Sequence, residues 1–403
     1  MSPRLLALSF GNFVIGTGTL IVPGMLPALA DGLGLSLHAT AQLITAFAIT
    51  VCVGAPLLAG VTSRYDRRAL LVSMQILFFA GHLASALVSS FGGMLLTRIA
   101  SSVGAALFTS QAAVTAALLV PPAERGRAIA FVFVGWSIAQ VIGMPLGAYV
   151  GATLGWRAGF ALVAIGSLAA AGAVGWTLPR GLEVKSIDRT MWRSLVAHPA
   201  IIPVLAVTVV NMSAQFALFS YFVPAAHAFV DASPTLVSML LAAFGATAVI
   251  GNIVAGRLVD RVGAARVVAA ALLVMLAAHL LWPFSPGALP VLLGAVLAWG
   301  TGCFAVNSAQ QARLMTLSPA HAPVSIALNT SGVYLGQAIG TVAGGVLLAR
   351  VAGAAGYASL AWLSVPLFVL ALGLSIFASR RSFASAPSWC ILYGQRKRGK
   401  FQA

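Results

Sequence analysis

Residues 128–150 read AIAFVFVGWSIAQVIGMPLGAYV, and residues 325–347 read SIALNTSGVYLGQAIGTVAGGVL. Neither stretch contains a charged side chain, and each is long enough to cross a hydrocarbon layer about 30 Å thick as a helix. The stretches share residues at a constant offset of 197 positions: Gly135, Gln140, Gly143 and Gly147 recur as Gly332, Gln337, Gly340 and Gly344. A membrane helix repeated in this way predicts a membrane protein with two similar halves.

The rest of the chain is equally apolar. Of its 403 residues, 60% are hydrophobic and 7% are charged, whereas a soluble domain has about 25% charged residues. This composition excludes a soluble globular protein. Twelve apolar runs are long enough to span a membrane: 5–29, 39–61, 69–90, 93–119, 128–150, 158–178, 200–224, 235–256, 266–284, 288–314, 325–349 and 355–378.

The offset of 197 positions also holds outside the two quoted stretches. Pro27, Phe47, Thr50, Gly54, Arg64 and His82 meet Pro224, Phe244, Thr247, Gly251, Arg261 and His279. The sequence therefore predicts an all-α integral membrane protein whose twelve transmembrane helices form two pseudo-symmetric six-helix bundles in parallel orientation. The predicted parts are an N-terminal bundle (1–178), a cytoplasmic linker (179–199), a C-terminal bundle (200–380) and a basic cytoplasmic tail (381–403).

The net charge of +16 comes from short basic clusters between the apolar runs, which is the pattern of a membrane topology and not of a nucleic-acid surface. With Arg4 on the inside, 20 of the 23 Lys and Arg residues fall on the cytoplasmic side, and Arg98, Arg157 and Arg350 do not. Both termini are therefore expected in the cytoplasm. The first apolar run is too long for the core of a cleaved signal peptide, so we expect it to remain as the first span.

Little in the sequence suggests a metal site or an enzyme. Cys52, Cys303 and Cys390 lack metal-binding spacing, so free thiols and no metal are expected. No phosphate-binding G-x-x-x-x-G-K-[ST] loop and no Gly-x-Ser-x-Gly turn occurs, which argues against direct use of ATP and against the rival interpretation of a polytopic membrane enzyme. We expect no cofactor.

The loop between runs 235–256 and 266–284 carries the most specific motif. Gly256-Arg257-Leu258-Val259-Asp260-Arg261-Val262-Gly263 is similar to the G-x-L-x-D-R-x-G loop signature of the major facilitator superfamily. This resemblance implies a conformational latch formed by Gly256, Asp260, Arg261 and Gly263, in which the carboxylate accepts charge-assisted hydrogen bonds. The equivalent first-half loop is degraded, because Ser63 replaces the acid, but it keeps basic residues, so we expect a looser latch from Arg64, Asp66 and Arg67.

Several other segments resemble one branch of this superfamily, the sugar efflux and drug:proton antiporter group. They are the Gly/Pro-rich segment with Gly135, Gly143, Pro145 and Gly147, the Pro121 to Ala128 loop, Gly155-Trp156-Arg157, and Phe216 to Pro224. The resemblance implies a secondary efflux transporter of a sugar-like, nucleoside-like or drug-like solute, coupled to protons by antiport. Close helix packing is the alternative explanation of the glycines.

The sequence departs from this branch at its usual proton site. Thr19 stands where the branch has an acid, and every carboxylate lies at a predicted helix end or in a loop: Asp31, Asp66, Glu124, Glu183, Asp188, Asp231 and Asp260. Facilitated diffusion by the same fold therefore remains the alternative to antiport. Arg98 resembles the branch's Arg within a span and is expected either to serve the site or to reach the outer headgroups. His82 and His279 are expected to form hydrogen bonds between helices.

Candidate substrate contacts are amides, rings and single polar groups within the spans. The predicted cavity residues are Asn12, Thr19, Phe47, Arg98, Gln111, Trp136, Gln140, Asn211, Gln215, Tyr221, Asn307, Gln310, Asn329 and Gln337. The expected partners are a small-molecule substrate, protons and membrane lipid, and the expected state is a monomer in a bacterial-type inner membrane.

Overall fold

A computed structural model describes residues 2–62, 65–182, 201–317 and 322–384, and every regular element within these ranges is a helix. Twelve of its helical segments are long and apolar enough to cross a membrane, six before residue 183 and six after residue 200. The prediction of an all-α protein with twelve spans is confirmed.

The six spans of the first half are formed by nine helical elements. These are α1 (Pro3–Gly24), α2 (Leu26–Leu33), α3 (Leu37–Val61), α4 (Arg67–Leu87), α5 (Phe91–Leu118), α6 (Arg125–Ile138), the π-helical turn η3 (Ala139–Gly143), α7 (Met144–Thr153) and α8 (Trp156–Thr177). The 3-10 turn η2 (Pro122–Glu124) lies in the loop before α6.

The second half has a matching series. It comprises α10 (Ile201–Phe219), α11 (Phe222–Val230), α12 (Pro234–Val262), α13 (Ala264–Leu281), the 3-10 turn η4 (Trp282–Phe284), α14 (Leu289–Leu317), α15 (Ala322–Leu348) and α16 (Gly353–Ala384).

Three spans that the sequence predicts as continuous helices are interrupted. The first breaks at Met25 and the seventh at Ser220–Tyr221, two to four residues before Pro27 and Pro224 respectively. A proline has no N–H and its ring crowds the carbonyl four residues earlier, so the helix cannot continue regularly there. Pro145 has the same effect in the fifth span, where the π-helical turn η3 immediately precedes α7.

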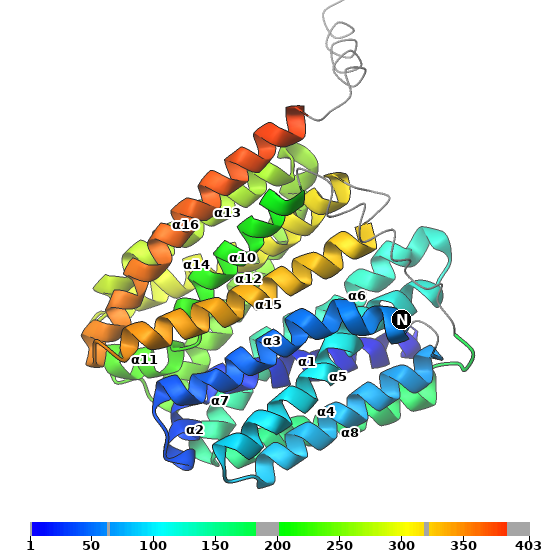
Figure 1. Ribbon diagram of the computed structural model, residues 1–403, viewed down its shortest axis with the longest axis horizontal. Coiled ribbons are helices and arrows are strands. Elements are labelled where there is room, and N and C mark those ends of the chain that lie inside the picture. The colour runs from blue at the N-terminus through cyan, green and yellow to red at the C-terminus, as the bar shows by residue number, and fades with distance from the viewer. Residues whose placement is uncertain (1, 63–64, 183–200, 318–321, 385–403) are drawn as a thin grey trace, which may run out of the picture.

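The helices pack in the same order in both halves, which Figure 1 shows as two groups of neighbouring rods. In the first half α1 packs on α6 and α8, and α4 packs on α5 and α8. In the second half α10 packs on α15 and α16, and α13 packs on α14 and α16. The repeated sequence therefore corresponds to a repeated arrangement of helices, while the exact limits of the two bundles and the linker stay predictions.

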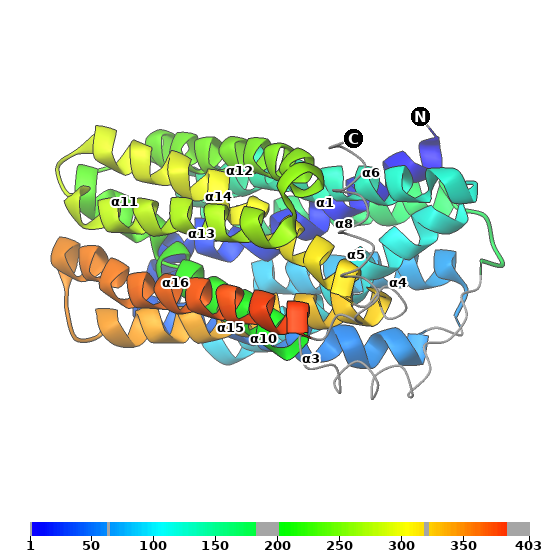
Figure 2. The ribbon, with the colours of Figure 1, turned by 90° about the horizontal axis from the view of Figure 1, so that it is seen from above.

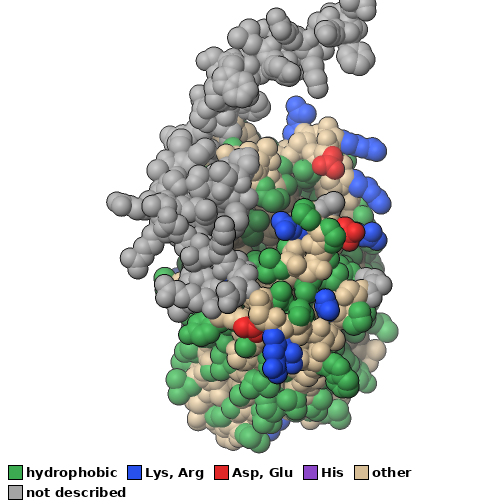
Figure 3. Space-filling view, turned by 90° about the vertical axis from the view of Figure 1, so that its right-hand side faces the viewer, with side chains coloured by type: hydrophobic (Ala, Val, Ile, Leu, Met, Phe, Trp, Pro, Cys, Tyr) green, Lys and Arg blue, Asp and Glu red, His purple; other side chains and the backbone are tan. Residues whose placement is uncertain are grey.

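All spans run along the long axis of the molecule, as Figure 2 shows, so the protein has two ends. We call the end at which α1 begins the N-terminal end and the opposite end the far end. Figure 3 looks at the N-terminal end, where basic side chains are spread among a few acidic ones. The helix ends and described loops there carry Arg4, Arg68, Arg125, Arg127, Arg180, Arg257, Arg261 and Arg266, whereas those at the far end carry Arg157 and Arg350.

The two halves touch through a restricted set of helices. Across the halves α3 packs on α15, α12 packs on η3 and α7, and α11 packs on α1 and α2. The fifth span thus meets α12 with its far portion, whereas its N-terminal portion, α6, packs on α1 and α5. Along the fifth span, the halves therefore contact each other through its far portion, η3 and α7, and not closely through α6.

Candidate functional site

Three helices of the second half bring three of the predicted amides, Asn307, Gln310 and Asn329, into one polar column. Thr208 on α10 donates its hydroxyl proton to Asn329 Oδ1 on α15 at 2.7 Å, and Asn329 Nδ2 donates to Asn307 Oδ1 on α14 at 3.3 Å. Gln310 Nε2 donates to the Val204 carbonyl at 2.8 Å and lies 3.4 Å from the Thr208 hydroxyl. The column therefore links α10, α14 and α15, and Asn307 forms its partly exposed edge.

Several atoms of this column have hydrogen-bonding capacity left over. Asn211, one turn from Thr208 on the same stripe of α10, is fully buried, and neither its Oδ1 nor its Nδ2 has a partner among the described residues. Gln310 Oε1 is also buried without a partner. A buried polar group that lacks a hydrogen bond costs about 1–3 kcal/mol, so these atoms favour a bound polar molecule or water at this place.

An aromatic group adjoins the column toward the far end. Trp299 Nε1 donates to Gln215 Oε1 at 3.2 Å, and the Trp299 ring meets Phe219 and Phe244 edge to face at 5.7 and 5.3 Å between centroids. The His279 ring meets the Trp299 ring edge to face at 4.9 Å between centroids, and its Nδ1 bonds to the Met275 carbonyl of its own helix.

His279 thus bonds within its own helix, unlike the expectation, whereas His82 also has the expected hydrogen bond between helices. His82 also uses Nδ1 for a carbonyl of its own helix, that of Phe78 at 2.9 Å, and its Nε2 lies 3.5 Å from Arg98 Nη1 on α5. The carbonyl four residues earlier is always within reach of a helical side chain, whereas a partner on another helix depends on how the two helices are rotated.

Arg98 is a buried charged residue of the first half and lies on the part of α5 nearer the far end. It is 1% exposed, its Nη1 donates to the Gly18 carbonyl of α1 at 3.3 Å, and its guanidinium lies 4.5 Å from the centroid of the Phe47 ring on α3. Its Nε has no partner within the described residues. The structure thus places Arg98 in the protein interior and not at the outer headgroups.

The other predicted cavity residues lie apart from these two groups. Gln111 accepts a 2.6 Å hydrogen bond from Arg67, Asn12 donates to the Val132 carbonyl of α6, and Tyr221 donates to the Thr341 carbonyl. Thr19 bonds to the Ile15 carbonyl of its own helix. Trp136 faces Gly16 on α1, while the buried residues Gln140 and Gln337 lie in η3 and on α15.

The glycines of the fifth span allow it to approach α1 closely. A Cβ added at Gly135 would overlap the Ser9 carbonyl, one at Gly143 would overlap the Thr17 hydroxyl, and one at Gly147 would lie 3.0 Å from Ile21 Cγ1. In the second half Gly336, Gly340 and Gly344 of α15 meet the α10 backbone in the same way. Both halves use this packing internally. Next to it, the Pro145 carbonyl accepts a hydrogen bond from the Ser238 hydroxyl of α12.

The predicted latch of the second half is exposed, and among the described residues no contact holds it. Gly256 has no atom within 4 Å of an added Cβ, and Asp260 and Arg261 are exposed. Gly263 ends α12 with a φ of 87°, a left-handed conformation that favours glycine. In the first half Arg64 lies outside the described residues, and the buried Arg67 points to Gln111.

Asp66 joins two segments of the first half by hydrogen bonds. Its Oδ2 accepts from the Ala69 N–H at the start of α4, and its Oδ1 accepts from the Gly181 and Leu182 N–H groups, just after α8, at 2.7 and 3.1 Å. Burial alone would raise the pKa of this carboxyl, but the three backbone donors and the charge of Arg68 outweigh it and hold the pKa below its usual value.

We expect Asp66→Ala to lower the stability of the detergent-solubilised protein by about 1 kcal/mol through loss of the helix cap. Because the pKa of Asp66 is lower in the folded state, its charge stabilises the fold above the unfolded-state pKa of about 4, and this contribution is lost as the pH falls through the folded-state pKa. The difference in melting temperature between wild type and variant should therefore shrink from pH 7 to the most acidic pH at which the protein remains soluble. Asp66→Asn, which keeps the cap, should fall between them. A difference that does not change with pH would contradict this assignment.

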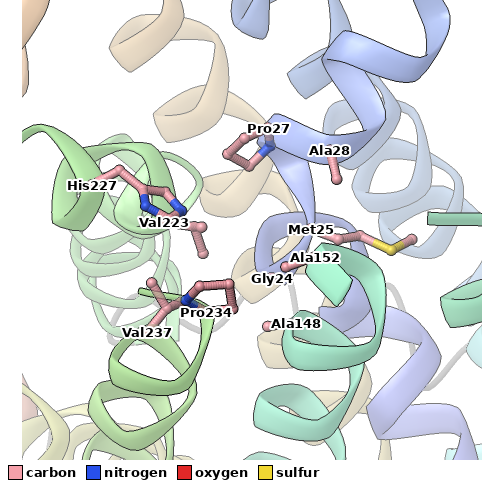
Figure 4. Close-up of a pocket in the computed structure, with 10 residues that line it drawn as sticks. All are labelled: Gly24, Met25, Pro27, Ala28, Ala148, Ala152, Val223, His227, Pro234 and Val237. Atoms are coloured by element: carbon pink, nitrogen blue, oxygen red, sulfur yellow. The ribbon is translucent and has the colours of Figure 1, made fainter. Parts of the chain in front are cut away.

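The halves enclose a small cavity at the far end, shown in Figure 4. It has a volume of about 40 Å³, and its lining includes Met25, Pro27 and Ala152 from the first half and Val223 and His227 from the second. This is room for about one water molecule. None of the predicted substrate residues lines it, and its size agrees with a far end that is closed in this state.

Comparison with known proteins places these features in a family. The model of the Major Facilitator Superfamily matches residues 8–229 and 205–388, which together cover most of the chain. The chain belongs to the major facilitator superfamily. It is therefore a membrane transporter of small molecules and not an enzyme.

Similar proteins of this superfamily share most of the chain's length. The inner membrane transport protein YdhP of Escherichia coli (strain K12) is 29% identical over 344 residues, 85% of this chain and 88% of that protein. A chloramphenicol resistance protein of Streptomyces lividans is 32% identical over 252 residues, 61% of this chain and 64% of that protein. In fold, the chain is similar to a bacterial homologue of the human lysosomal transporter Spinster, with a TM-score of 0.77, 18% identity, and coverage of 94% and 97%.

Three residues with notable contacts are recognised only in the structure. Thr208 completes the amide column, although a Thr in a span more often bonds to its own helix. Arg313 is buried and holds α14 to α16 through Ser375 and Ser379, while the Nδ1 atom of His38 on α3 faces Gly345 of α15 across the two halves. The sequence offers one indication that Arg313 matters, its position near the end of an apolar run. It offers no such indication for His38.

Proposed function

We propose that the protein is a secondary transporter that exports a small uncharged polar solute, sugar-like, nucleoside-like or drug-like, by alternating access. The observation that carries this proposal is the one-sided interface: α12 packs on the far portion of the fifth span, η3 and α7, and not closely on α6. Two similar bundles joined at one end can rock about that contact and expose a central site to either side.

The substrate class is inferred from the polar column. Its amides are neutral and its unsatisfied atoms include both donors and acceptors, so a ligand with hydroxyl or amide groups matches it best. The nearby Trp299, Phe219 and Phe244 would favour a ligand with an apolar or aromatic part, although they are buried in this state. Chloramphenicol, named by one similar protein, has both features and is a reasonable first probe.

The orientation follows from the basic side chains. Lys and Arg are retained on the cytoplasmic side of a membrane, and the helix ends and described loops at the N-terminal end are much richer in Arg than those at the far end. We infer that the N-terminal end faces the cytoplasm of a bacterial cell, that both termini lie there, and that the conformation described here opens inward. We expect the protein to work as a monomer.

The proposal includes coupling of export to protons by antiport. It is supported by the resemblance to drug:proton antiporters, while the carboxylates of the described spans argue for the alternative, facilitated diffusion. Asp31 is exposed near the far end and Asp260 lies in the last turn of α12, so neither is near the amide column or Arg98 along the membrane axis.

Transport into inverted vesicles distinguishes the two alternatives. Vesicles that contain the protein and generate an inside-acid pH gradient should accumulate radiolabelled chloramphenicol, D-xylose or uridine above the external concentration if antiport operates. Collapse of the gradient with nigericin should then reduce accumulation to the level of vesicles without the protein. Equilibration at an unchanged rate after collapse would replace antiport by facilitated diffusion, and no protein-dependent uptake of any of the three would remove the proposed substrate class.

A further inference from the structure

The lipid-facing surface of the second half has a groove that transport by alternating access does not require. It lies between α15 and α16 near the far end and has a volume of about 360 Å³. Both helices pack mainly on α10 and only lightly on each other, so a channel is left between them on the outside. Its walls include Val346, which is 44% exposed, and Trp362, which is 60% exposed.

Arg350 closes the groove at the end of the apolar span. It lies two residues after the end of α15, which places its charge where the hydrocarbon ends and the headgroups begin. Ala343, which also lines the groove, lies seven residues earlier on α15, about 10 Å deeper along the helix. The groove therefore offers a positive charge at headgroup level and an apolar channel below it.

The other two basic residues of the outer part have protein partners. Arg157 stacks on the Trp156 ring at 4.1 Å and donates to the Ser89 hydroxyl at 3.1 Å, and Arg98 is buried against Gly18 and Phe47. Arg350 forms no ion pair with any acidic side chain in the described part of the chain, and it is exposed. An arginine on the outer side departs from the preference for cytoplasmic basic residues, and a bound anion would compensate its charge.

We propose that this groove binds an anionic phospholipid of the outer leaflet, with the phosphate at Arg350 and one acyl chain along the apolar wall of Ala343, Val346 and Leu363. The two parts of such a lipid match the two parts of the groove in charge and in depth. Trp362, exposed beside the chain, adds the amphipathic ring that is typical of this level of a membrane. Phosphatidylglycerol should bind better than phosphatidylcholine with the same acyl chains, because the choline charge opposes Arg350.

Native mass spectrometry of the full-length protein in a mild detergent tests this site, with the two lipids titrated separately. The first phosphatidylglycerol should bind wild type roughly fivefold more tightly than Arg350→Gln, the effect of about 1 kcal/mol for one basic residue near anionic lipid. Arg157→Gln, in which an outer arginine with protein partners is removed, is the matched control and should bind like wild type. Ala343→Trp, which fills the groove but keeps Arg350, should also weaken binding.

The outcomes that overturn the proposal are distinct. Equal binding of the two lipids by wild type, unchanged binding by Arg350→Gln, or an equal loss in Arg157→Gln would each mean that Arg350 only extends toward the headgroups without a built site. Unchanged binding by Ala343→Trp would mean that no acyl chain occupies the groove. Monodisperse elution and an unchanged melting temperature in lipid-free detergent establish that each variant is folded.

Discussion

Replacing Gly245 by leucine should reduce transport at least about tenfold while leaving the protein folded. Gly245 lies on α12 where it crosses the π-helical turn η3, and an added Cβ would lie 2.7 Å from the Gln140 carbonyl carbon and 2.9 Å from Val141 Cα. These are backbone atoms of the other half, so they cannot rotate away. Overpacking costs about 1–3 kcal/mol, and a shift of about 1.4 kcal/mol between two states already changes their ratio tenfold.

Two measurements on Gly245→Leu separate a conformational effect from misfolding. Transport per unit of reconstituted protein should fall, and a cysteine placed at Ala152, which lines the small far-end cavity, should react faster with a membrane-impermeant maleimide than in the parent. Both proteins would lack the native cysteines. Gly294→Leu on α14, where an added Cβ meets no atom within 4 Å, is the control and should behave like the parent. Normal transport with unchanged labelling would show that the halves do not close through this contact.

Replacing Gly135 by leucine should prevent recovery of folded protein. The added side chain would overlap the Ser9 carbonyl and lie 3.0 Å from the Phe13 nitrogen, so α1 would have to move away from α6. That movement would also break the hydrogen bonds from Ser9 to the Phe131 carbonyl and from Asn12 to the Val132 carbonyl. Overpacking and two lost hydrogen bonds together cost about 4 kcal/mol, a large fraction of the stability of a typical protein.

The yield of monodisperse protein after detergent extraction, together with its melting temperature, measures this effect. Gly172→Leu on α8, where no atom lies within 4 Å of an added Cβ, should give the wild-type yield. Gly340→Leu, at which an added Cβ would overlap the Ser213 carbonyl of α10, should fail as Gly135→Leu does. If Gly135→Leu is recovered normally but does not transport, its segment has a role in the transport cycle and not mainly in packing.

These two glycines show why a motif in a sequence leaves its role open. Gly135 and Gly245 are both glycines in apolar helices, but the first lies against a helix of its own half and the second against the other half. A sequence shows that a helix can approach a neighbour closely at a glycine, but not which neighbour is there. The resemblance of residues 135–147 to antiporters therefore coexists with a packing role that both halves share.

The sequence predicts the residue types of the candidate site better than it predicts their arrangement. Asn307, Gln310 and Asn329 were predicted as candidate contacts, and they meet in one column, whereas Gln111 meets Arg67 and Tyr221 meets Thr341 elsewhere. Thr208 joins the column although it is not among the predicted contacts, whereas the predicted contact Thr19 bonds within its own helix. The role of each of these residues in substrate binding stays a proposal.

The sequence by itself determined that the chain crosses a membrane twelve times in two similar sets of six helices. Both properties are local: about 20 apolar residues in a row are stable only across a hydrocarbon layer, and a repeat is read by comparing the chain with itself. Only the tertiary structure decided which polar groups meet, where the spans break and which parts of the two halves pack together. Thr208 and Asn329 are 121 residues apart, and their contact depends on the rotation and approach of two helices, which no local pattern of residues specifies.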